Sequence, residues 1–292
     1  MPTSVDIRVE PVSSEDQLAL TFPAFQEAVR SGKALTACAW ASGDAIGLAA
    51  AERKEGADEA TLLSVAVKPA WRGRGVGSKL LEAIEDELRR LGCRKADLTY
   101  MSGNPSTPAV ERMLARAQWD PPRPRLMICY TTIDRVAQGR WIATPLPAAP
   151  GVNVFSWRDL SALERDQVAS DPRVPEGLSP FRDENKIEGA ISVGLRKNGE
   201  VAGWFLTHRI APDTVRYSTL YLRADAMSRG WGFGLVAEAI RRHAAGALAR
   251  IAPNCCMDFS PGNVMMANFV RKKLLPTLTA TRISMGASKS LR

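Results

Sequence analysis

The sequence predicts an α/β protein that consists of two similar domains in tandem. The chain has 292 residues, which is enough for two domains of ordinary size. Strand-like and helix-like segments follow one another in the same order in both halves, and each half has one glycine-rich loop directly before a helix. The stretch 136–151 contains three prolines and two glycines, which is typical of a linker. We therefore expect domains over 1–136 and 151–292, joined by a linker over 137–150.

The elements of the first half follow from the spacing of its apolar residues. The turn Ser42-Gly43-Asp44 separates two strands of a hairpin, and the apolar run at 60–67 is typical of a strand buried on both faces. From Gly77 the apolar residues recur at helical spacing until Gly92, a common residue just after a helix. The expected strands are 6–11, 34–40, 45–53, 60–67, 96–101 and 125–133, and the expected helices are 77–91 and 107–117.

The second half repeats this order. Asn198-Gly199 is a strong signal for a two-residue hairpin turn within 190–210. After the glycine-rich loop, apolar residues at helical spacing predict a helix. These apolar residues are Leu235, Val236, Ala239, Ile240 and Ala244. The other expected elements are strands at 152–157, 215–224 and 255–259 and helices at about 159–170 and 265–274.

The two glycine-rich loops match at an offset of 157 residues. Arg72-Gly73-Arg74-Gly75-Val76-Gly77 then falls on Arg229-Gly230-Trp231-Gly232-Phe233-Gly234. Glycine lets the backbone approach a ligand closely and adopt positive φ. Free N–H groups at the start of a helix bind phosphate, and arginine side chains add charge-assisted hydrogen bonds. Each loop therefore predicts a pyrophosphate site, with a glycine spacing unlike that of dinucleotide folds or P-loop NTPases.

The segment 62–92 resembles motif A of the GNAT acyltransferase superfamily. It has a strand ending in Val65-Ala66-Val67-Lys68-Pro69, then the arginine and glycine loop, then an amphipathic helix. The segment 221–243 is similar, with Ala226 in place of the proline. Through the duplication the resemblance covers most of the chain. It implies two tandem GNAT domains, each with a mixed, mainly antiparallel sheet flanked by helices and a splayed strand pair that binds acetyl-CoA or another acyl-CoA.

The resemblance also implies which residues bind the cofactor. The pyrophosphate would contact each loop, and the pantetheine arm would run along the backbone near Val65–Val67 and Leu222–Ala224. Asn104 and Asn263 stand where the family often places a pantetheine contact, and each is equally suited to cap a helix. The expected cofactor-binding residues are Val65, Ala66, Val67, Arg72, Gly73, Arg74, Gly75, Val76, Gly77, Ser78 and Asn104 in the first domain and Leu222, Arg229, Gly230, Trp231, Gly232, Phe233, Gly234 and Asn263 in the second. The first copy matches the motif more fully, so we expect it to be the better preserved site.

The usual catalytic residues of the superfamily are absent. Acylation of an amine needs a base to take a proton from the acceptor and an acid to protonate the thiolate. The family often uses a glutamate on the fourth strand and a tyrosine on the helix after the fifth. Thr61 and Ser218 stand at the glutamate positions, and Leu114 and Val270 at the tyrosine positions.

Four other residues are candidates for the catalytic role. Glu59 shares a strand face with the missing base, although a solvated strand-end carboxylate is the simpler interpretation. Tyr100 ends the fifth strand, and Tyr221 lies on the strand before the second loop. The usual pKa of a histidine would suit proton abstraction by His208, although a strand histidine is more often structural.

The composition excludes several classes of protein. At 45% hydrophobic and 24% charged residues it is typical of globular proteins, with no apolar run of the length of a membrane span and no signal-peptide pattern. The five cysteines form no CxxC pair and the chain has two histidines, so we expect no metal site. Scattered cysteines fit reduced thiols, and we expect a cytoplasmic protein without a membrane partner.

These observations favour an acyl-CoA-dependent N-acyltransferase that acts on the amine of a small-molecule acceptor. The net charge of +8 suits coenzyme A but also RNA, so an aminoacyl-tRNA-dependent transferase of duplicated GNAT fold is an alternative. Two pyrophosphate loops argue against it, and a steep salt dependence of tRNA binding would favour it. A non-catalytic acyl-CoA-binding sensor or scaffold is a second alternative, which the missing acid and base favour and which thioester cleavage with any amine would eliminate.

Overall fold

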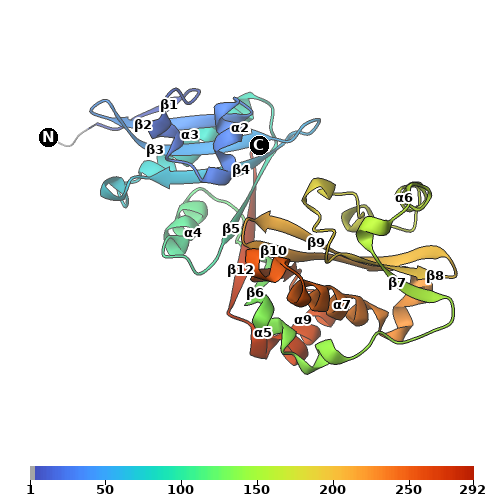
Figure 1. Ribbon diagram of the computed structural model, residues 1–292. Coiled ribbons are helices and arrows are strands. Elements are labelled where there is room, and N and C mark those ends of the chain that lie inside the picture. The colour runs from blue at the N-terminus through green and yellow to red at the C-terminus, as the bar shows by residue number, and fades with distance from the viewer. Residues whose placement is uncertain (1–3) are drawn as a thin grey trace. The chain divides into compact units, whose positions relative to one another are not determined.

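The computed structural model describes residues 4–292, except for the side chains of Ser228 and Arg229. The chain divides into two compact units (Figure 1). Unit 1 contains the residues up to Arg125 together with Ile283–Arg292, and unit 2 contains Leu126–Arg282. Each unit is a mixed sheet flanked by helices, so the predicted α/β fold is confirmed.

Unit 1 has a sheet in the order β1-β2-β3-β4-β5-β12, in which the pair β4 and β5 is parallel and the other pairs described are antiparallel. Its strands are β1 (Asp6–Val9), β2 (Ala34–Ala41), β3 (Asp44–Arg53), β4 (Glu59–Val67), β5 (Lys95–Met101) and the end of β12 (Ala280–Ser290). Its α-helices are α1 (Glu15–Leu18), α2 (Gln26–Arg30), α3 (Val76–Arg90) and α4 (Thr107–Arg116). Short 3-10 turns occur at Pro23–Phe25 and Pro69–Trp71.

Unit 2 has the same arrangement in the order β7-β8-β9-β10-β11-β6, with β10 and β11 parallel. Its strands are β7 (Val152–Ser156), β8 (Val193–Lys197), β9 (Glu200–Ala211), β10 (Thr214–Leu222), β11 (Asn254–Phe259) and most of β6 (Arg123–Thr132). Its α-helices are α5 (Ile133–Ala137), α6 (Ala162–Ala169), α7 (Trp231–Ala245), α8 (Leu248–Ile251) and α9 (Val264–Phe269). A π-helical turn, Val270–Leu274, follows α9, and 3-10 turns lie at Arg140–Ala143, Trp157–Asp159, Glu176–Leu178, Glu184–Lys186, Ala224–Arg229 and Leu275–Thr277.

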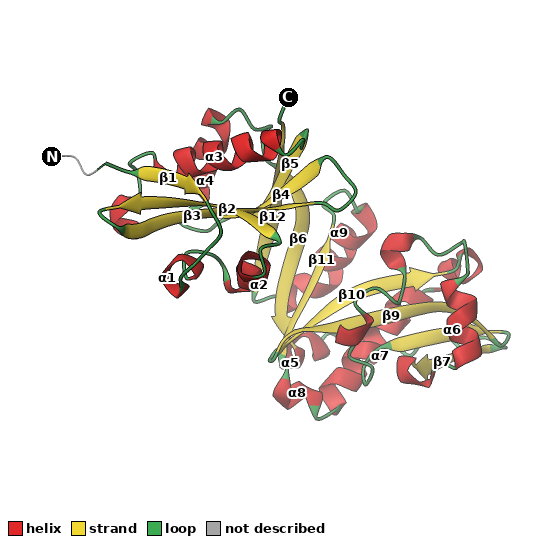
Figure 2. Cartoon of the chain, turned by 90° about the horizontal axis from the view of Figure 1, so that it is seen from above, coloured by secondary structure: helices red, strands yellow, loops and turns green. Residues whose placement is uncertain are grey.

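The sheets separate two layers of helices (Figure 2). In unit 1, Ala49 and Ala51 of β3 pack in the cluster that contains the apolar face of α3, whereas Ala50 packs with Leu18 of α1 and Val29 of α2. In unit 2 the same alternation places successive residues of β9 in different clusters, one beneath α7 and one beneath α6. Successive strand residues point to opposite faces, so both faces of each sheet are buried.

The last strand of each half belongs to the other unit, which corrects the expected domain boundaries. We expected domains over 1–136 and 151–292, with 125–133 as the final strand of the first. Instead β6 pairs with β11 in unit 2, from Asn254↔Thr132 to Phe259↔Met127. β12, which the sequence analysis missed, pairs with β5 in unit 1, and the C-terminus lies among the elements of that unit (Figure 1).

The segment expected to be a linker, 137–150, is also part of unit 2. Ile142 is buried in the core cluster beneath α7, and Trp141 and Leu146 pack against that cluster. The prolines and glycines that suggested a linker therefore mark an irregular segment that is packed on a domain. Within the described residues, no helix is long and apolar enough to cross a membrane.

Candidate functional site

The strands β4 and β5 of unit 1 separate before the glycine-rich loop. Their parallel pairing runs from Glu59↔Lys95 to Leu62↔Leu98 and then stops. On the other side of β4 the register with β3 shifts between Ala50 and Ala51, which forms a β-bulge at Leu63. The edge of β4 from the bulge to Val67 therefore faces a splayed gap, as the resemblance implied.

The loop of unit 1 has the conformation that a pyrophosphate site requires. Gly73 and Gly75 have φ of +76° and +81°, which residues with a Cβ rarely adopt. Gly75 is the N-cap of α3 and no side chain caps this helix, so the N–H groups of its first turn have no intrahelical partner. Arg72 donates through Nε to the carbonyl of Val67 at 2.9 Å, and the guanidinium of Arg74 lies 5.2 Å from the ring centre of Trp71. The expected loop residues are thus gathered at one exposed helix start.

The helix α4 brings apolar side chains to the gap in unit 1. An ideal Cβ at Gly77 would lie 3.5 Å from Sδ of Met113 and 3.9 Å from Cγ1 of Val65. Leu114, at the position of the family tyrosine, is 1% exposed and packs in the core. No acid therefore replaces the tyrosine at this position.

Two catalytic candidates of unit 1 are engaged in other contacts. Glu59 accepts a hydrogen bond from Nζ of Lys54 at 2.6 Å and lies on the paired start of β4, remote from the loop at its other end. Tyr100 donates to Oε1 of Glu111 at 2.9 Å, and burial together with this carboxylate raises the pKa of Tyr100 well above its usual value. Neither arrangement supports the expected catalytic role.

The strands β10 and β11 of unit 2 separate in the same way. They pair from Thr214↔Asn254 to Arg216↔Cys256, and the register between β10 and β9 shifts between Tyr217 and Thr219. Ser218 lies in this bulge. Unit 2 therefore repeats both the splayed pair and the bulge of unit 1.

The two loops correspond at an offset of 155 residues in the fold, which corrects the 157 taken from the glycine pattern. The strands before the loops, Glu59–Val67 and Thr214–Leu222, are 155 residues apart, as are the N-caps Gly75 and Gly230. The buried positions of the two helices agree. Val76, Leu80, Leu81, Ile84 and Leu88 correspond to Trp231, Leu235, Val236, Ala239 and His243. The strand edge of unit 2 that corresponds to Val65–Val67 is therefore Leu220–Leu222 and not Leu222–Ala224.

This shift gives several expected residues of the second loop a different role. Gly230, with φ of +73°, ends the loop, and Gly232 and Gly234 lie inside α7. Trp231 is 1% exposed and donates through Nε1 to the carbonyl of Pro147 at 3.0 Å, so its side chain belongs to the core. An ideal Cβ at Gly234 would clash with Leu146 at 2.6 Å. The side chain of Arg229 lies outside the described residues.

A cavity of about 520 Å³ occupies the gap between β10 and β11. Leu220 and Leu222 line one wall, and Gly230 and Gly232 of the loop and α7 line another. Phe233, half exposed, also faces this cavity. Most of its lining is apolar, which suits a pantetheine arm or an acyl chain better than a charged group.

Asn104 and Asn263, the two asparagines expected to contact the pantetheine arm, form different hydrogen bonds. Asn263 lines the cavity and accepts a hydrogen bond from the N–H of Met266 at 3.1 Å, so it caps α9. Asn104 donates to the carbonyl of Met101 at 3.4 Å, and the N-cap of α4 is Ser106. Capping thus explains Asn263 and not Asn104.

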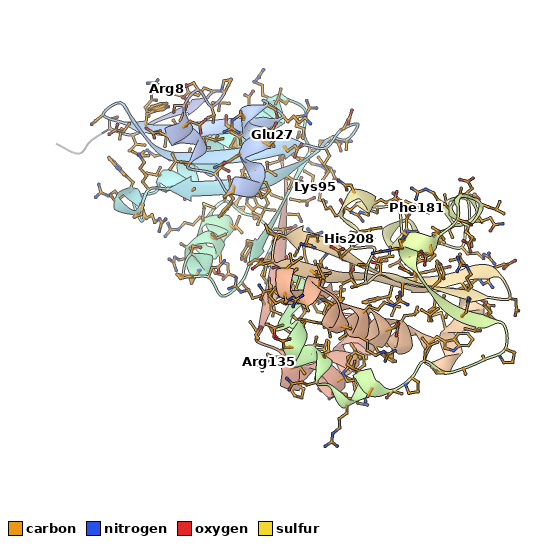
Figure 3. All side chains as sticks on the ribbon, viewed as in Figure 1. Arg8, Glu27, Lys95, Arg135, Phe181 and His208 are labelled. Carbon is orange, nitrogen blue, oxygen red and sulfur yellow. The ribbon has the colours of Figure 1, made fainter. Side chains whose placement is uncertain are left out.

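His208 belongs to a polar group at the point where β10 and β11 separate (Figure 3). Its Nδ1 lies 2.9 Å from Oγ of Ser218, and Arg216 donates to the same oxygen at 3.1 Å. Ser218 and Asp258 line the cavity. Burial, and next the charge of Arg216, lower the pKa of His208, so its imidazole is neutral near pH 7. In the sequence analysis Ser218 stood at the position of the family glutamate without a catalytic role, and Asp258 was not a candidate, because a bulge in a strand carries no local signal.

Tyr221 lies outside this cavity. Its ring packs on Trp204 with a centroid distance of 4.5 Å, and its hydroxyl donates to the carbonyl of Arg173 at 3.4 Å. Its strand neighbours Leu220 and Leu222 face the cavity, so Tyr221 points to the opposite face. Burial raises the pKa of Tyr221. It is not placed to act on a ligand in the gap.

Part of the chain matches a known protein family in sequence, and the whole chain is similar to solved structures in its fold. Residues 6–114 match the model of the acetyltransferase (GNAT) family. A tandem GNAT protein from the clavulanic acid biosynthesis pathway superposes with a TM-score of 0.69 at 13% identity, over 99% of each chain. A GCN5-related glucosamine N-acetyltransferase region of a fungal multi-domain β-N-acetylglucosaminidase gives 0.66 at 14% identity, over 98% of this chain and 38% of that one. A GCN5-related N-acetyltransferase from Sphaerobacter thermophilus gives 0.58 at 16% identity, over 99% and 96%.

No curated protein matches the chain in sequence. The family match lies within unit 1, and the structural matches extend over both units. Residues 6–114 thus match the GNAT family model, and the fold of the whole chain is similar to that of a tandem GNAT protein.

Proposed function

We propose that the chain is an acyl-CoA-dependent N-acyltransferase that moves an acetyl or other short acyl group to the amine of a small-molecule acceptor. The observation that carries the proposal is the loop of unit 1, where Gly73 and Gly75 have positive φ and lead into the uncapped first turn of α3. The N–H groups and the helix dipole favour an anion there. The family match of unit 1 supports an acyl thioester as the ligand.

In unit 1 the loop from Arg72 to Ser78 would hold the pyrophosphate. At Val65–Val67 the strand β4 is paired with β3 along one edge. Its other edge is unpaired there, because the pairing of β4 with β5 ends at Leu62. Its free backbone groups would bind the amides of the pantetheine arm, as a further strand would.

In unit 2 the edge at Leu220–Leu222 would hold a second pantetheine arm in the cavity between β10 and β11. Gly230 at the N-cap of α7 would face the pyrophosphate with the N–H groups of the next turn. Unit 2 is therefore a proposed cofactor site in its own right.

We assign the proton transfers of unit 2 to Ser218 and His208. Acyl transfer forms a C–N bond and breaks the C–S bond of the thioester, so the nitrogen loses a proton and the sulfur gains one. Ser218 lines the cavity, and its hydroxyl lies 2.9 Å from Nδ1 of His208. A neutral imidazole can take the proton of the amine through this hydroxyl and return it to the sulfur. In unit 1 the bulge position that corresponds to Ser218 is Leu63, whose side chain has no hydroxyl that could form such a pair.

The test combines binding with turnover. Calorimetric titration of the full chain with coenzyme A should give one or two sites. Release of free thiol from acetyl-CoA should depend on a primary amine from a panel of small molecules. Failure to bind coenzyme A overturns the proposal. Binding without thiol release for any amine, with acetyl-CoA or longer acyl-CoA, overturns the transferase activity and favours the sensor alternative.

A further inference from the structure

The cavity between β10 and β11 contains a carboxylate to which the proposed acyl transfer gives no role. Among the lining residues that the structure describes, Asp258 is the one charged side chain. Most of the other lining residues are apolar, and they include Leu178, Phe205 and Met257. A single negative charge in an apolar cleft attracts a cation and repels an anion. The cavity is therefore suited to a ligand with one positive charge and an apolar body.

This carboxylate lies on the face of the sheet opposite to α7. The helices α6 and α7 cover opposite faces (Figure 1). Met257 and Phe259 of β11 belong to the core cluster beneath α7, so Asp258 between them points to the face beneath α6. Leu178 lines the cavity from the segment between α6 and β8, where Val174 packs against the cluster beneath α6. The cavity therefore extends through the gap between the strands to a second side.

The side chain of Arg216 places Asp258 next to the proposed proton pathway. Its Nε lies 3.1 Å from Oγ of Ser218 and 3.9 Å from Oδ1 of Asp258. The hydroxyl and the carboxylate are therefore neighbours, and both residues line the cavity. An ammonium bound by Asp258 would lie beside Ser218, whose Oγ is 2.9 Å from Nδ1 of His208. We call the part of the cavity lined by Leu178, Ser218 and Asp258 the acceptor end.

The protein itself satisfies this carboxylate poorly. The side chain of Asp258 is 26% exposed, and it accepts no hydrogen bond from any residue that the structure describes. The distance of 3.9 Å to Arg216 is too long for a hydrogen bond. Carboxylates that are mostly buried are rarely left without donors, so Asp258 is available to the N–H groups of a ligand.

Unit 1 has no charge at the corresponding position. The parallel strand pairs begin at Lys95 in β5 and at Asn254 in β11, so Asp258 corresponds to Thr99. Thr99 is uncharged, and its hydroxyl accepts a hydrogen bond from Nη1 of Arg125 at 2.9 Å. The carboxylate is therefore a property of the cavity in unit 2 and not of the duplicated fold.

We propose that Asp258 binds the ammonium of the acceptor and that unit 2 acylates primary amines with an apolar body and no acidic group. This inference rests on the proposed function and names the class of its acceptor. The ammonium pairs with Asp258 next to Ser218, and the apolar body lies against Leu178. The proton then leaves the nitrogen through Ser218 and reaches the sulfur as the C–N bond forms and the C–S bond breaks. An amino acid is a poor acceptor, because its carboxylate meets the charge of Asp258.

The first test is steady-state thiol release from acetyl-CoA by the full-length chain. The probes are phenethylamine, hexylamine and phenylalanine, which has the body of phenethylamine and an added carboxylate. The kcat/KM of the better apolar amine should exceed that of phenylalanine at least about tenfold. Asp258→Asn should raise the KM of this amine about tenfold and change kcat less than about twofold, because a charge-assisted hydrogen bond is lost. Asp166→Asn, at an exposed position of α6, is the control and should change neither constant.

The second test is calorimetry, which does not depend on turnover. With coenzyme A at saturation, Asp258→Asn should weaken the binding of phenethylamine or hexylamine about tenfold. The affinity for coenzyme A itself should stay within about twofold of the wild type, which also shows that the variant is folded.

Each other result overturns part of the proposal. If the wild type and the Asp258→Asn variant bind the amines equally, Asp258 does not bind the ammonium. A lower kcat at unchanged KM would mean that Asp258 acts as a base, which also contradicts the assignment. If phenylalanine reacts as well as the apolar amines, or if neither apolar amine binds while coenzyme A does, the class of acceptor is wrong. If coenzyme A does not bind, the proposed function fails, and titration with the amines alone then decides on Asp258.

Discussion

The two glycine-rich loops look alike in sequence and are built differently in the fold. In unit 1 the left-handed residues Gly73 and Gly75 form an exposed loop before α3. In unit 2 a 3-10 turn of six residues precedes Gly230, and α7 begins with the buried Trp231. A glycine pattern therefore indicates that a loop can bind a phosphate, but it does not determine where that loop ends.

The helix start follows the core and not the glycines. Full burial of a large apolar side chain stabilises a domain by about 2–3 kcal/mol, more than the fraction of a kcal/mol by which glycine is disfavoured inside a helix. Trp231 therefore occupies the buried helix position that corresponds to Val76 in unit 1, and Gly232 and Gly234 of the motif lie within α7. The resulting cleft of unit 2 contains the described cavity, although the motif is better preserved in unit 1.

The substitution Gly75→Glu should have the largest effect. It places a Cβ at φ of +81° and a carboxylate at the proposed anion site, so coenzyme A affinity in unit 1 should fall roughly a hundredfold or more. Calorimetry should then detect only the unit 2 site, and Gly230→Glu should have the reciprocal result. Gly56→Glu is the control, because Gly56 has φ of +70° with no other atom near its Cβ position and lies outside the loop. Unchanged affinity at the first site would contradict the assignment.

The substitution His208→Gln should come next, if unit 2 carries the chemistry. The turnover number should fall about a hundredfold with little change in KM, because general base catalysis is lost. The lowered pKa of His208 keeps the imidazole neutral down to pH values below 6.5, so wild-type turnover should be level near pH 7 and fall as the pH drops further. Ser218→Ala should act in the same direction. Tyr221→Phe, on the opposite face, should leave the rate unchanged. If the His208→Gln variant has the turnover number of the wild type, acyl transfer takes place in unit 1 and not in unit 2.

The substitution Lys289→Met tests whether unit 1 depends on the strand it receives. Lys289 of β12 is paired with the buried carboxylate of Glu85 on α3, which also accepts a hydrogen bond from Nε1 of Trp119 at 2.7 Å. Loss of the ammonium leaves this carboxylate less well satisfied, at a cost of about 2 kcal/mol. Hydrogen exchange of the amides of α3 and β5 should accelerate accordingly, while those of α7 should not. The same substitution at the exposed Lys33 is the control for the loss of charge. If the amides of α3 and β5 exchange equally slowly in the Lys289 and Lys33 variants, unit 1 does not depend on β12.

The substitution Tyr100→Phe should have the smallest effect. The hydroxyl is bonded to Glu111 and its pKa is raised, so it is a poor proton donor. Steady-state thiol release should change by less than about twofold, as for other groups outside general acid–base catalysis. A tenfold decrease in the rate of thiol release would instead indicate that Tyr100 is the general acid and that unit 1 is the catalytic unit.

Local features of the fold were predictable because they depend on neighbouring residues. The turn at Asn198-Gly199 has positive φ at both residues, and it joins β8 to β9 as predicted. The long helices after both loops also occur, with their apolar faces buried. The exchange of β6 and β12 was not predictable, because the sequence of a strand does not specify the sheet edge with which it pairs. The pair formed by His208 and Ser218 was missed for a related reason, since a bulge and a pairing between two strands bring them together.

By itself the sequence determined the duplicated order of elements, the position of a glycine-rich loop before a helix in each half, and the apolar residues Leu114 and Val270 at the positions expected for a tyrosine. These depend on residue type and on spacing over a few residues. Only the tertiary structure decided that the loops align through Gly75 and Gly230, that each unit takes its last strand from the other half, and that Ser218 and Asp258 line one cavity. The physical reason is that packing and strand pairing join residues far apart in the chain, and their free energy outweighs local preference.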